Sequence, residues 1–200
     1  MSKKNFFSLL LFSGILLFVS GNSFAQSQAL TKGASAPMFK AKASLAGNDF
    51  NFALKKALEK GPVVLYFYPS AYTGGCDLEA HTFAEMKDQF TKAGATIIGV
   101  SADDIQRLNS FSSDPSYCAG KFPVASDADG KIAAMYGLQL TPPQAGVKDV
   151  RGVEVTHGFI PRTTFVIGKD DKIVAVFSSK ADHISPDEHV KQSLAIVKNL

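Results

Sequence analysis

The feature that most constrains this chain is an apolar run that leads, through a proline and a threonine, to a cysteine at the start of a helix. Residues Val63 to Tyr68 are aliphatic or aromatic without a polar interruption, as in a strand covered on both faces. After Cys76, apolar residues recur near helical spacing up to about Lys92, and Gly94 supplies an ending. The sequence therefore predicts a strand, a turn and a helix whose first turn contains Cys76.

The turn between this strand and helix predicts a reactive thiol. At a helix N-terminus, free N–H groups and the helix dipole favour the anionic form of cysteine, and the thiolate is the nucleophile. Pro69 would fix the backbone and shield the sulfur, and Thr73 would place a hydroxyl in the same pocket as Cys76. A buried cysteine beside an incidental proline fits the local pattern equally well, so both interpretations stay open at this point.

The spacing Pro69-x-x-x-Thr73-x-x-Cys76 after a central strand resembles the active-site signature of the peroxiredoxins. In that family an arginine far downstream precedes another strand, and Arg162 stands in this position before Thr-Thr-Phe-Val-Ile, residues 163–167. The resemblance extends over roughly Ala34 to Leu200. It is greatest to the bacterioferritin-comigratory, or Q-type, subfamily, here in an exported form.

The resemblance implies an α/β, thioredoxin-like fold with a central mixed sheet flanked by helices, and the reduction of hydroperoxides without a cofactor or metal. Cys76 would be the peroxidatic cysteine, Thr73 would hydrogen-bond the peroxide and Pro69 would shield the pocket. Arg162 would stabilise the thiolate and polarise the O–O bond, since a guanidinium lowers the pKa of a nearby thiol and donates in a fixed fork. The product would be a sulfenic acid, recycled by an external dithiol such as a thioredoxin-like protein.

The chain departs from the Q-type pattern in three places. His81 stands where many members carry a second cysteine, so that resolving arrangement is absent. Asp77 replaces a frequent threonine; it suits the helix dipole, but its charge should raise the pKa of the neighbouring thiol. The segment Leu138–Gly158 is longer than the usual connection before the arginine strand, and its prolines and glycines predict a surface loop.

Cys118 is the other of only two cysteines in the chain. An even count in an oxidising compartment favours pairing, and we expect Cys118 to resolve the sulfenic acid by forming a Cys76–Cys118 disulfide. A permanent structural bridge or an unpaired loop thiol is the alternative. Because bridged Cα atoms lie within about 7 Å of each other, the disulfide would require local unfolding of the Cys76 helix and movement of the Cys118 loop.

The N-terminus indicates export. A basic start is followed by an apolar run over residues 6–19 and by small residues at Ser23 and Ala25, the pattern of a secretory signal peptide (residues 1–25) cut after Ala25. An uncleaved anchor is the alternative. The mature chain, residues 26–200, would be one peroxiredoxin domain in the periplasm or secreted, without membrane attachment, as a monomer or weak dimer. The formal charge of +3, less two lysines in the signal, leaves +1 and no basic stripe, which gives no support for nucleic-acid binding.

Other functional classes have less support. The histidines do not cluster at metal-ligand spacing: His81, His157, His183 and His189. No Cys-x-x-Cys motif and no tryptophan occur, which disfavours thioredoxin-type oxidoreductases and glutathione peroxidases. A non-catalytic thioredoxin-fold protein with a structural or redox-sensing Cys76–Cys118 disulfide is the second hypothesis. Pro69, Thr73 and Arg162 count against it, because a structural bridge requires none of them.

The remaining pattern predicts alternating elements. In chain order these are an edge strand at 50–52, a helix at 53–59, strands at 63–68 and 96–101 around the Cys76 helix, a helix at 104–111, a strand at 124–126, a helix at 131–136, a hairpin of strands at 163–167 and 173–177, and a last helix that begins near Ser185 with a capping box. A parallel βαβ unit followed by a late antiparallel hairpin is the thioredoxin-like order.

Overall fold

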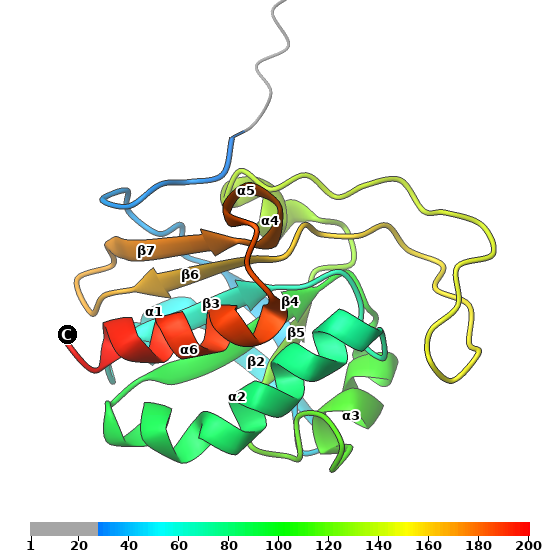
Figure 1. Ribbon diagram of the computed structural model, residues 1–200, viewed down its shortest axis with the longest axis horizontal. Coiled ribbons are helices and arrows are strands. Elements are labelled where there is room, and N and C mark those ends of the chain that lie inside the picture. Colours follow the sequence, from blue (N-terminus) through cyan, green and yellow to red (C-terminus); the bar gives the residue numbers. More distant parts are fainter. Residues whose placement is uncertain (1–27) are drawn as a thin grey trace, which may run out of the picture.

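The computed structural model describes residues 28–200, so the expected signal peptide lies outside the described residues. The described chain forms one mixed sheet with strand order β2-β1-β5-β4-β3-β6-β7, flanked by helices (Figure 1). The elements are β1 (Lys40–Leu45), β2 (Asn48–Ala53), α1 (Leu54–Leu58), β3 (Val63–Phe67), α2 (Gly74–Lys92), β4 (Thr96–Ser101), α3 (Ile105–Ser113), β5 (Val124–Ser126), α4 (Lys131–Met135), β6 (Thr163–Ile167), β7 (Ile173–Ser178), α5 (Ser179–Asp182) and α6 (Pro186–Val197). The α/β thioredoxin-like fold that the sequence predicted is confirmed.

The central strand β3 is buried on both faces and divides the molecule into two cores. Val63, Leu65 and Phe67 face a core that includes α1 and α4. The alternate residues Val64 and Tyr66 face a second core under α2, α3 and α6, which lie together on one side of the sheet (Figure 1). A continuous apolar run was the signal for this strand, because neither face can be polar.

Strand pairing brings three distant segments to one edge of the sheet. β3 pairs in parallel with β4, with Phe67 opposite Val100. It pairs antiparallel with β6, with Phe67 opposite Thr163. The residues that follow β3 and β4 therefore lie beside the residues that precede β6, and this edge is where Cys76 and Arg162 meet.

Two expectations about local structure were incomplete or wrong. The strand expected at 50–52 is part of β2, but its antiparallel partner β1 was not foreseen. β1 contains Lys40 and Lys42 among small residues, so it lacks an apolar signature. Ser185 does precede α6 as the N-cap residue, but its hydroxyl donates to Asp187 Oδ1 at 2.5 Å and makes no side-chain cap bond, so the predicted capping box is wrong. Within residues 28–200, no helix is both long and apolar enough to span a membrane.

A fully buried histidine attaches α6 to the sheet. The His189 ring hydrogen-bonds with Thr164 Oγ1 through Nδ1 and with Ser179 Oγ through Nε2, each at 2.9 Å. Burial, together with the positive charge of Arg162, lowers the pKa of His189 to about 4. The folded protein therefore keeps this ring neutral at pH values where a free histidine is charged.

This histidine should make the fold sensitive to acid. As the pH falls below about 6.5, His189 becomes protonated in the unfolded chain but stays neutral in the folded chain until pH about 4. The free energy of unfolding therefore decreases between pH about 6.5 and pH about 4, by about 3 kcal/mol at most. Urea denaturation at pH 7 and pH 4.5 tests this with His189→Gln, whose stability should depend less on pH than that of the wild type. Other groups titrate in both proteins and cancel in the difference. An identical pH dependence would contradict the assignment.

Candidate active site

Cys76 and Arg162, which are far apart in the sequence, are in direct contact at the edge described above. Arg162 Nη2 donates to Cys76 Sγ at 3.1 Å. The cysteine is 2% exposed, and most of the arginine side chain is also buried. Gly75 makes this approach possible, because a Cβ atom there would lie only 3.2 Å from Arg162 Nη2.

The turn that precedes α2 presents further donors to the sulfur. Thr73 is the N-cap residue of α2, and its carbonyl oxygen accepts from the N–H groups of Cys76 and Asp77 at 2.8 and 3.0 Å. The Thr73 hydroxyl donates to Ser70 O at 2.7 Å, and it lowers the pKa of the Cys76 thiol. Pro69, half-buried, begins this turn directly after β3.

The electrostatics of the sulfur differ in two respects from the expectation. Burial raises the pKa of the Cys76 thiol, while Arg162, the Ser70 backbone and the Thr73 hydroxyl lower it. Burial outweighs these donors, which the sequence could not show. Glu79, and not Asp77, is the main anionic group that raises this pKa; Asp77 instead acts on Cys118. Burial also raises the pKa of Asp77, to about 6.

Glu79 also contacts Arg162, although it was not among the predicted site residues. It lies one turn after Cys76 on α2, is fully buried, and forms an ion pair with Arg162 Nη1 through Oε2. Burial raises the pKa of Glu79 to about 7 in spite of the guanidinium. Its spacing of three residues from Cys76 was the available signal, since residues three apart share a helix face.

Cys118 lies in the turn after α3, and its side chain is fully buried. It shares the core that contains Cys76, and both cysteines are free thiols in this structure. Burial, with the negative charges of Asp114 and Asp77, raises the pKa of Cys118 well above its ordinary value. The two cysteine segments touch through the rings of Tyr72 and Tyr117, whose centroids are 5.3 Å apart at 89°.

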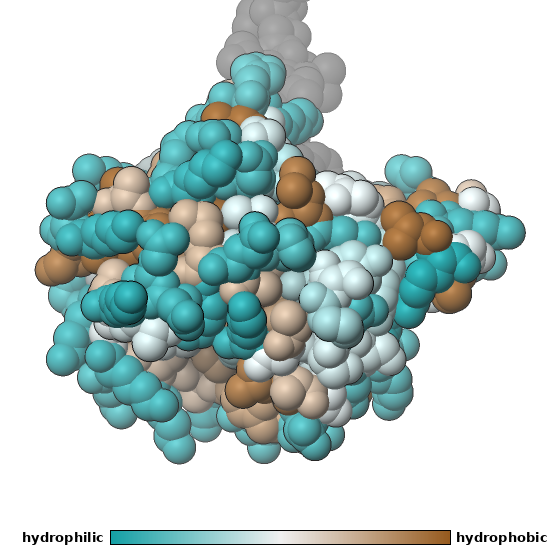
Figure 2. All heavy atoms as spheres, turned by 60° about the horizontal axis from the view of Figure 1, so that its bottom comes forward, coloured by the Kyte–Doolittle hydropathy of each residue, from teal (hydrophilic) through white to brown (hydrophobic). Residues whose placement is uncertain are grey.

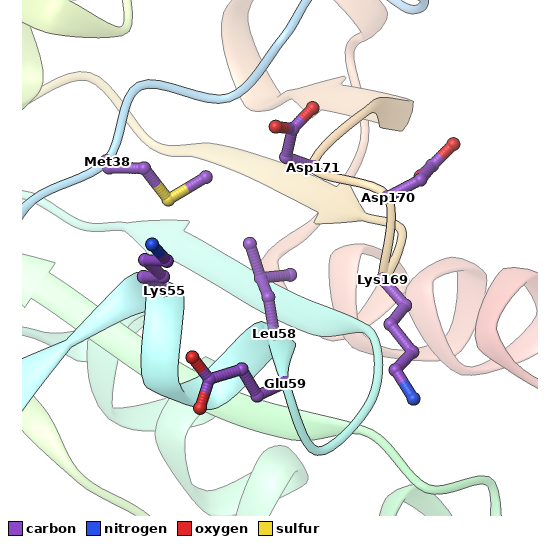
Figure 3. A pocket seen from close by; sticks show the side chains of 7 residues that line it. All are labelled: Met38, Lys55, Leu58, Glu59, Lys169, Asp170 and Asp171. Carbon is purple, nitrogen blue, oxygen red and sulfur yellow. The ribbon is translucent and has the colours of Figure 1, made fainter.

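A separate hollow of about 630 Å³ lies between α1 and the β6–β7 turn (Figure 3). Its lining includes the side chains of Met38 and Leu58, with charged residues of α1 and of the turn around them. No residue of the Cys76 environment lines it, so this hollow is not the candidate active site. Within residues 28–200, no group of three or more His, Cys, Asp or Glu side chains is arranged to hold a metal ion.

The fold and the buried thiol held by an arginine define a thioredoxin-like, thiol-dependent peroxidase. The sequence profile of the AhpC/TSA family matches residues 32–176. A Mycobacterium tuberculosis protein named as a candidate peroxiredoxin is 34% identical over 145 residues, which is 72% of this chain and 83% of that protein. The chloroplastic peroxiredoxin Q of Oryza sativa subsp. japonica is 27% identical over 172 residues, 86% of this chain and 68% of that protein.

Solved structures agree with these relatives. The crystal structure of peroxidoxin BcpB from Mycobacterium tuberculosis superposes with a TM-score of 0.69 at 29% identity, over 86% of this chain and 98% of that one. The bacterioferritin comigratory protein of Xanthomonas campestris superposes with a TM-score of 0.64 at 25% identity, over 86% and 98% of the two chains. The chain therefore belongs to the AhpC/TSA family of peroxiredoxins, which are thiol-dependent hydroperoxide reductases recycled by thiol reductants.

Proposed function

We propose that Cys76 is the peroxidatic cysteine of a peroxidase that reduces hydrogen peroxide and organic hydroperoxides. The single observation that carries this proposal is the 3.1 Å contact between Arg162 Nη2 and the buried Cys76 sulfur. The Xanthomonas campestris bacterioferritin comigratory protein has alkyl peroxide reduction activity, which supports organic hydroperoxides as one substrate class for this chain.

In the proposed step, the Cys76 thiolate attacks one peroxide oxygen. An S–O bond forms and the O–O bond breaks. The departing oxygen takes up a proton, which replaces the one that the thiol lost on ionisation, and leaves as water or an alcohol. The sulfur is oxidised by two electrons to a sulfenic acid. Because negative charge moves from sulfur to the departing oxygen, donors fixed around both atoms stabilise the transition state more than the ground state.

The surrounding residues have distinct roles in this step. Arg162 stabilises the thiolate and then donates to the peroxide oxygens in a fixed fork. Thr73 positions the peroxide through its hydroxyl, and Pro69 shields the sulfur from bulk water. Since burial opposes ionisation of Cys76, these donors determine how much thiolate is present at neutral pH.

We further propose that Cys118 resolves the sulfenic acid. Its thiolate attacks the Cys76 sulfur, water leaves, and the resulting disulfide is reduced by an external dithiol through exchange. The shared core and the contact between Tyr72 and Tyr117 support this pairing. Both thiols are buried and form no disulfide in this structure. The start of α2 and the turn around Cys118 must therefore open before the disulfide forms. The N-terminal pattern supports export, and with it a reductant of the periplasm or the cell exterior.

Intact mass spectrometry with thiol alkylation tests the proposal directly. The reduced protein receives one equivalent of hydrogen peroxide, and free thiols are then alkylated. We expect the loss of two hydrogens, no alkylated thiol, and recovery with dithiothreitol. A gain of one oxygen with Cys118 still alkylated would keep Cys76 as the peroxidatic residue but overturn the role of Cys118. A reduced protein that does not react with peroxide would overturn both and favour a structural or sensing disulfide.

A further inference from the structure

Between β3 and α2, four polar groups of the turn at residues 70–72 form hydrogen bonds with residues from elsewhere in the chain. The Ser70 hydroxyl and the Ala71 N–H donate to the two carboxylate oxygens of Asp103, each at 2.8 Å. Arg107 Nη2 donates to Ala71 O at 2.8 Å, and the backbone N–H of Val150 donates to Tyr72 O at 2.9 Å. The Ser70 backbone of this same turn lowers the pKa of the Cys76 thiol, and Ser70 O accepts from the Thr73 hydroxyl at 2.7 Å.

Asp103 is the centre of this arrangement. It is fully buried just after β4, at the sheet edge where Cys76 and Arg162 meet. Beyond its bonds to the turn, it accepts from Ser101 Oγ at 2.7 Å and hydrogen-bonds with His157 Nε2 at 2.8 Å. It also forms an ion pair with Arg107 Nε at 2.8 Å. A buried carboxylate needs such partners to remain charged. Although burial opposes ionisation, these donors keep the pKa of Asp103 below its ordinary value.

The long segment that precedes β6, which includes Leu138–Gly158, also contacts the 70–72 turn. It projects from the body of the protein (Figures 1 and 2), yet Asp149 within it is only 6% exposed. Asp149 Oδ2 pairs with Arg107 Nη2 at 2.8 Å and with Arg151 Nη2 at 2.7 Å. The Arg151 guanidinium lies 3.3 Å from the centre of the Tyr72 ring. The predicted surface loop is therefore anchored through residues 149–151, in the middle of the segment, on the turn that precedes Cys76.

We propose that Asp103 is a positioning residue for peroxide reduction, and that the Asp149–His157 part of the long segment exists to hold Asp103 and the 70–72 turn in place. This inference rests on the proposed role of Cys76. Asp103 touches neither sulfur nor peroxide; it acts through Ser70 and Ala71. Holding these residues fixes the Ser70 backbone, which lowers the pKa of the Cys76 thiol, and, through Ser70 O, the Thr73 hydroxyl.

The physical reason is that these donors act only when they point at the reacting atoms. Preorganised dipoles contribute to catalysis because they do not have to reorient during the reaction, and small displacements of a donor lose much of that effect. Without Asp103, the Ala71 N–H would lose its acceptor in the core, and the Ser70 hydroxyl would keep only its longer contacts with Ala71 O at 3.3 Å and His157 Nε2 at 3.5 Å. The turn would rearrange to satisfy these groups. The Ser70 backbone would no longer be held where it lowers the pKa of the Cys76 thiol, and the Thr73 hydroxyl would lose its fixed direction.

Asp127 provides a matched control. It is also a buried aspartate, 3% exposed, that follows a neighbouring strand, β5. Its carboxylate accepts from the N–H groups of Ile132 and Ala133 at 2.9 and 2.8 Å, at the start of α4. Both aspartates bind backbone N–H groups, but Asp127 binds none in the 70–72 turn. Replacing either by asparagine should destabilise the fold, and only Asp103→Asn should change the reactivity of Cys76.

The experiment compares Asp103→Asn, Asp149→Asn and Asp127→Asn in a full-length Cys118→Ser protein, in which Cys76 is the only thiol. Iodoacetamide alkylation as a function of pH gives the Cys76 thiol pKa, stopped-flow mixing with hydrogen peroxide gives the rate of first oxidation, and urea denaturation gives stability. We expect Asp103→Asn to raise the thiol pKa and to slow oxidation by about tenfold, the effect of one lost hydrogen bond. Asp149→Asn should act in the same direction but less, and Asp127→Asn should change stability alone.

Equal thiol pKa and oxidation rate in folded Asp103→Asn and Asp127→Asn would overturn the inference. If Asp103→Asn does not fold, Ser70→Ala is the deciding variant, because it removes one hydrogen bond to Asp103 and leaves the carboxylate its other partners. A Ser70→Ala protein with an unchanged thiol pKa and an unchanged oxidation rate would then contradict the inference. If the Cys118→Ser parent does not react with peroxide, the proposed function fails instead, while the alkylation profiles still test the action of Asp103 on the sulfur.

Discussion

Replacing Cys76 by serine is expected to abolish peroxide consumption. A serine hydroxyl cannot be oxidised to the equivalent of a sulfenic acid, so Cys76→Ser removes the redox step itself and not merely one contribution to its rate. The buried site, with Arg162 3.1 Å from the sulfur, has no other thiol in contact with the arginine. The measurement is peroxide consumption with excess dithiothreitol, and the expected rate is that of the dithiol alone.

Cys118→Ser is the matched control, because it also removes one buried thiol from the same core. Its first oxidation should stay fast, and only the intramolecular disulfide should disappear. Its sulfenic acid would then persist longer and be open to further oxidation. Turnover that survives Cys76→Ser, or a first oxidation that is lost in Cys118→Ser, would contradict the assignment of the two cysteines.

The second large effect is expected from Arg162→Ala, which should slow the oxidation of Cys76 by about 100-fold or more, the usual consequence of removing a donor to a developing oxyanion. Two causes combine. The thiol pKa should rise because the main charge that opposes burial is gone. The donors to the peroxide oxygens also disappear. Stopped-flow oxidation rates between pH 6 and pH 10 separate the two, because high pH restores the thiolate but not the donors.

Glu79 must be controlled for in this test. Without Arg162, its buried carboxylate would lose its ion-pair partner and would either carry an unpaired charge or take up a proton. Arg162→Ala combined with Glu79→Gln removes this complication, and Arg162→Lys keeps the charge without the planar fork. We expect both proteins to remain slow at high pH. A double variant with wild-type oxidation rates would show that Arg162 acts only by neutralising Glu79.

The fold was largely predictable because its central elements carry strong local signals. β3 is an uninterrupted apolar run, β6 is a run of β-branched and aromatic residues, and α2 has helical periodicity with a glycine beyond its end. β1 was not predictable in the same way, because its lysines alternate with small residues and its pairing with β2 is formed only in the sheet. A strand of this type is stabilised by its tertiary contacts, and local sequence patterns do not contain information about those contacts.

The site was predictable only where a motif or a resemblance pointed to it. Pro69, Thr73 and Cys76 were expected from their spacing and Arg162 from the resemblance, but the antiparallel pairing of β3 with β6, which brings Arg162 to the sulfur, is a property of the sheet. Asp103 was missed because its partners come from distant parts of the chain and its environment is defined by burial. The raised pKa of the Cys76 thiol was missed for the same reason, since burial is its largest cause.

The aromatic core that surrounds both sulfurs gives this protein an optical signal of its own. The chain contains five tyrosines and no tryptophan. Tyr66, Tyr68, Tyr72 and Tyr117 all belong to, or pack against, the core that holds the two cysteines. Near-ultraviolet circular dichroism depends on fixed aromatic packing, so four of the five tyrosines that contribute to it lie in the core around the two thiols, which the proposed Cys76–Cys118 disulfide would rearrange. The redox cycle can therefore be followed in the unlabelled, unmutated protein.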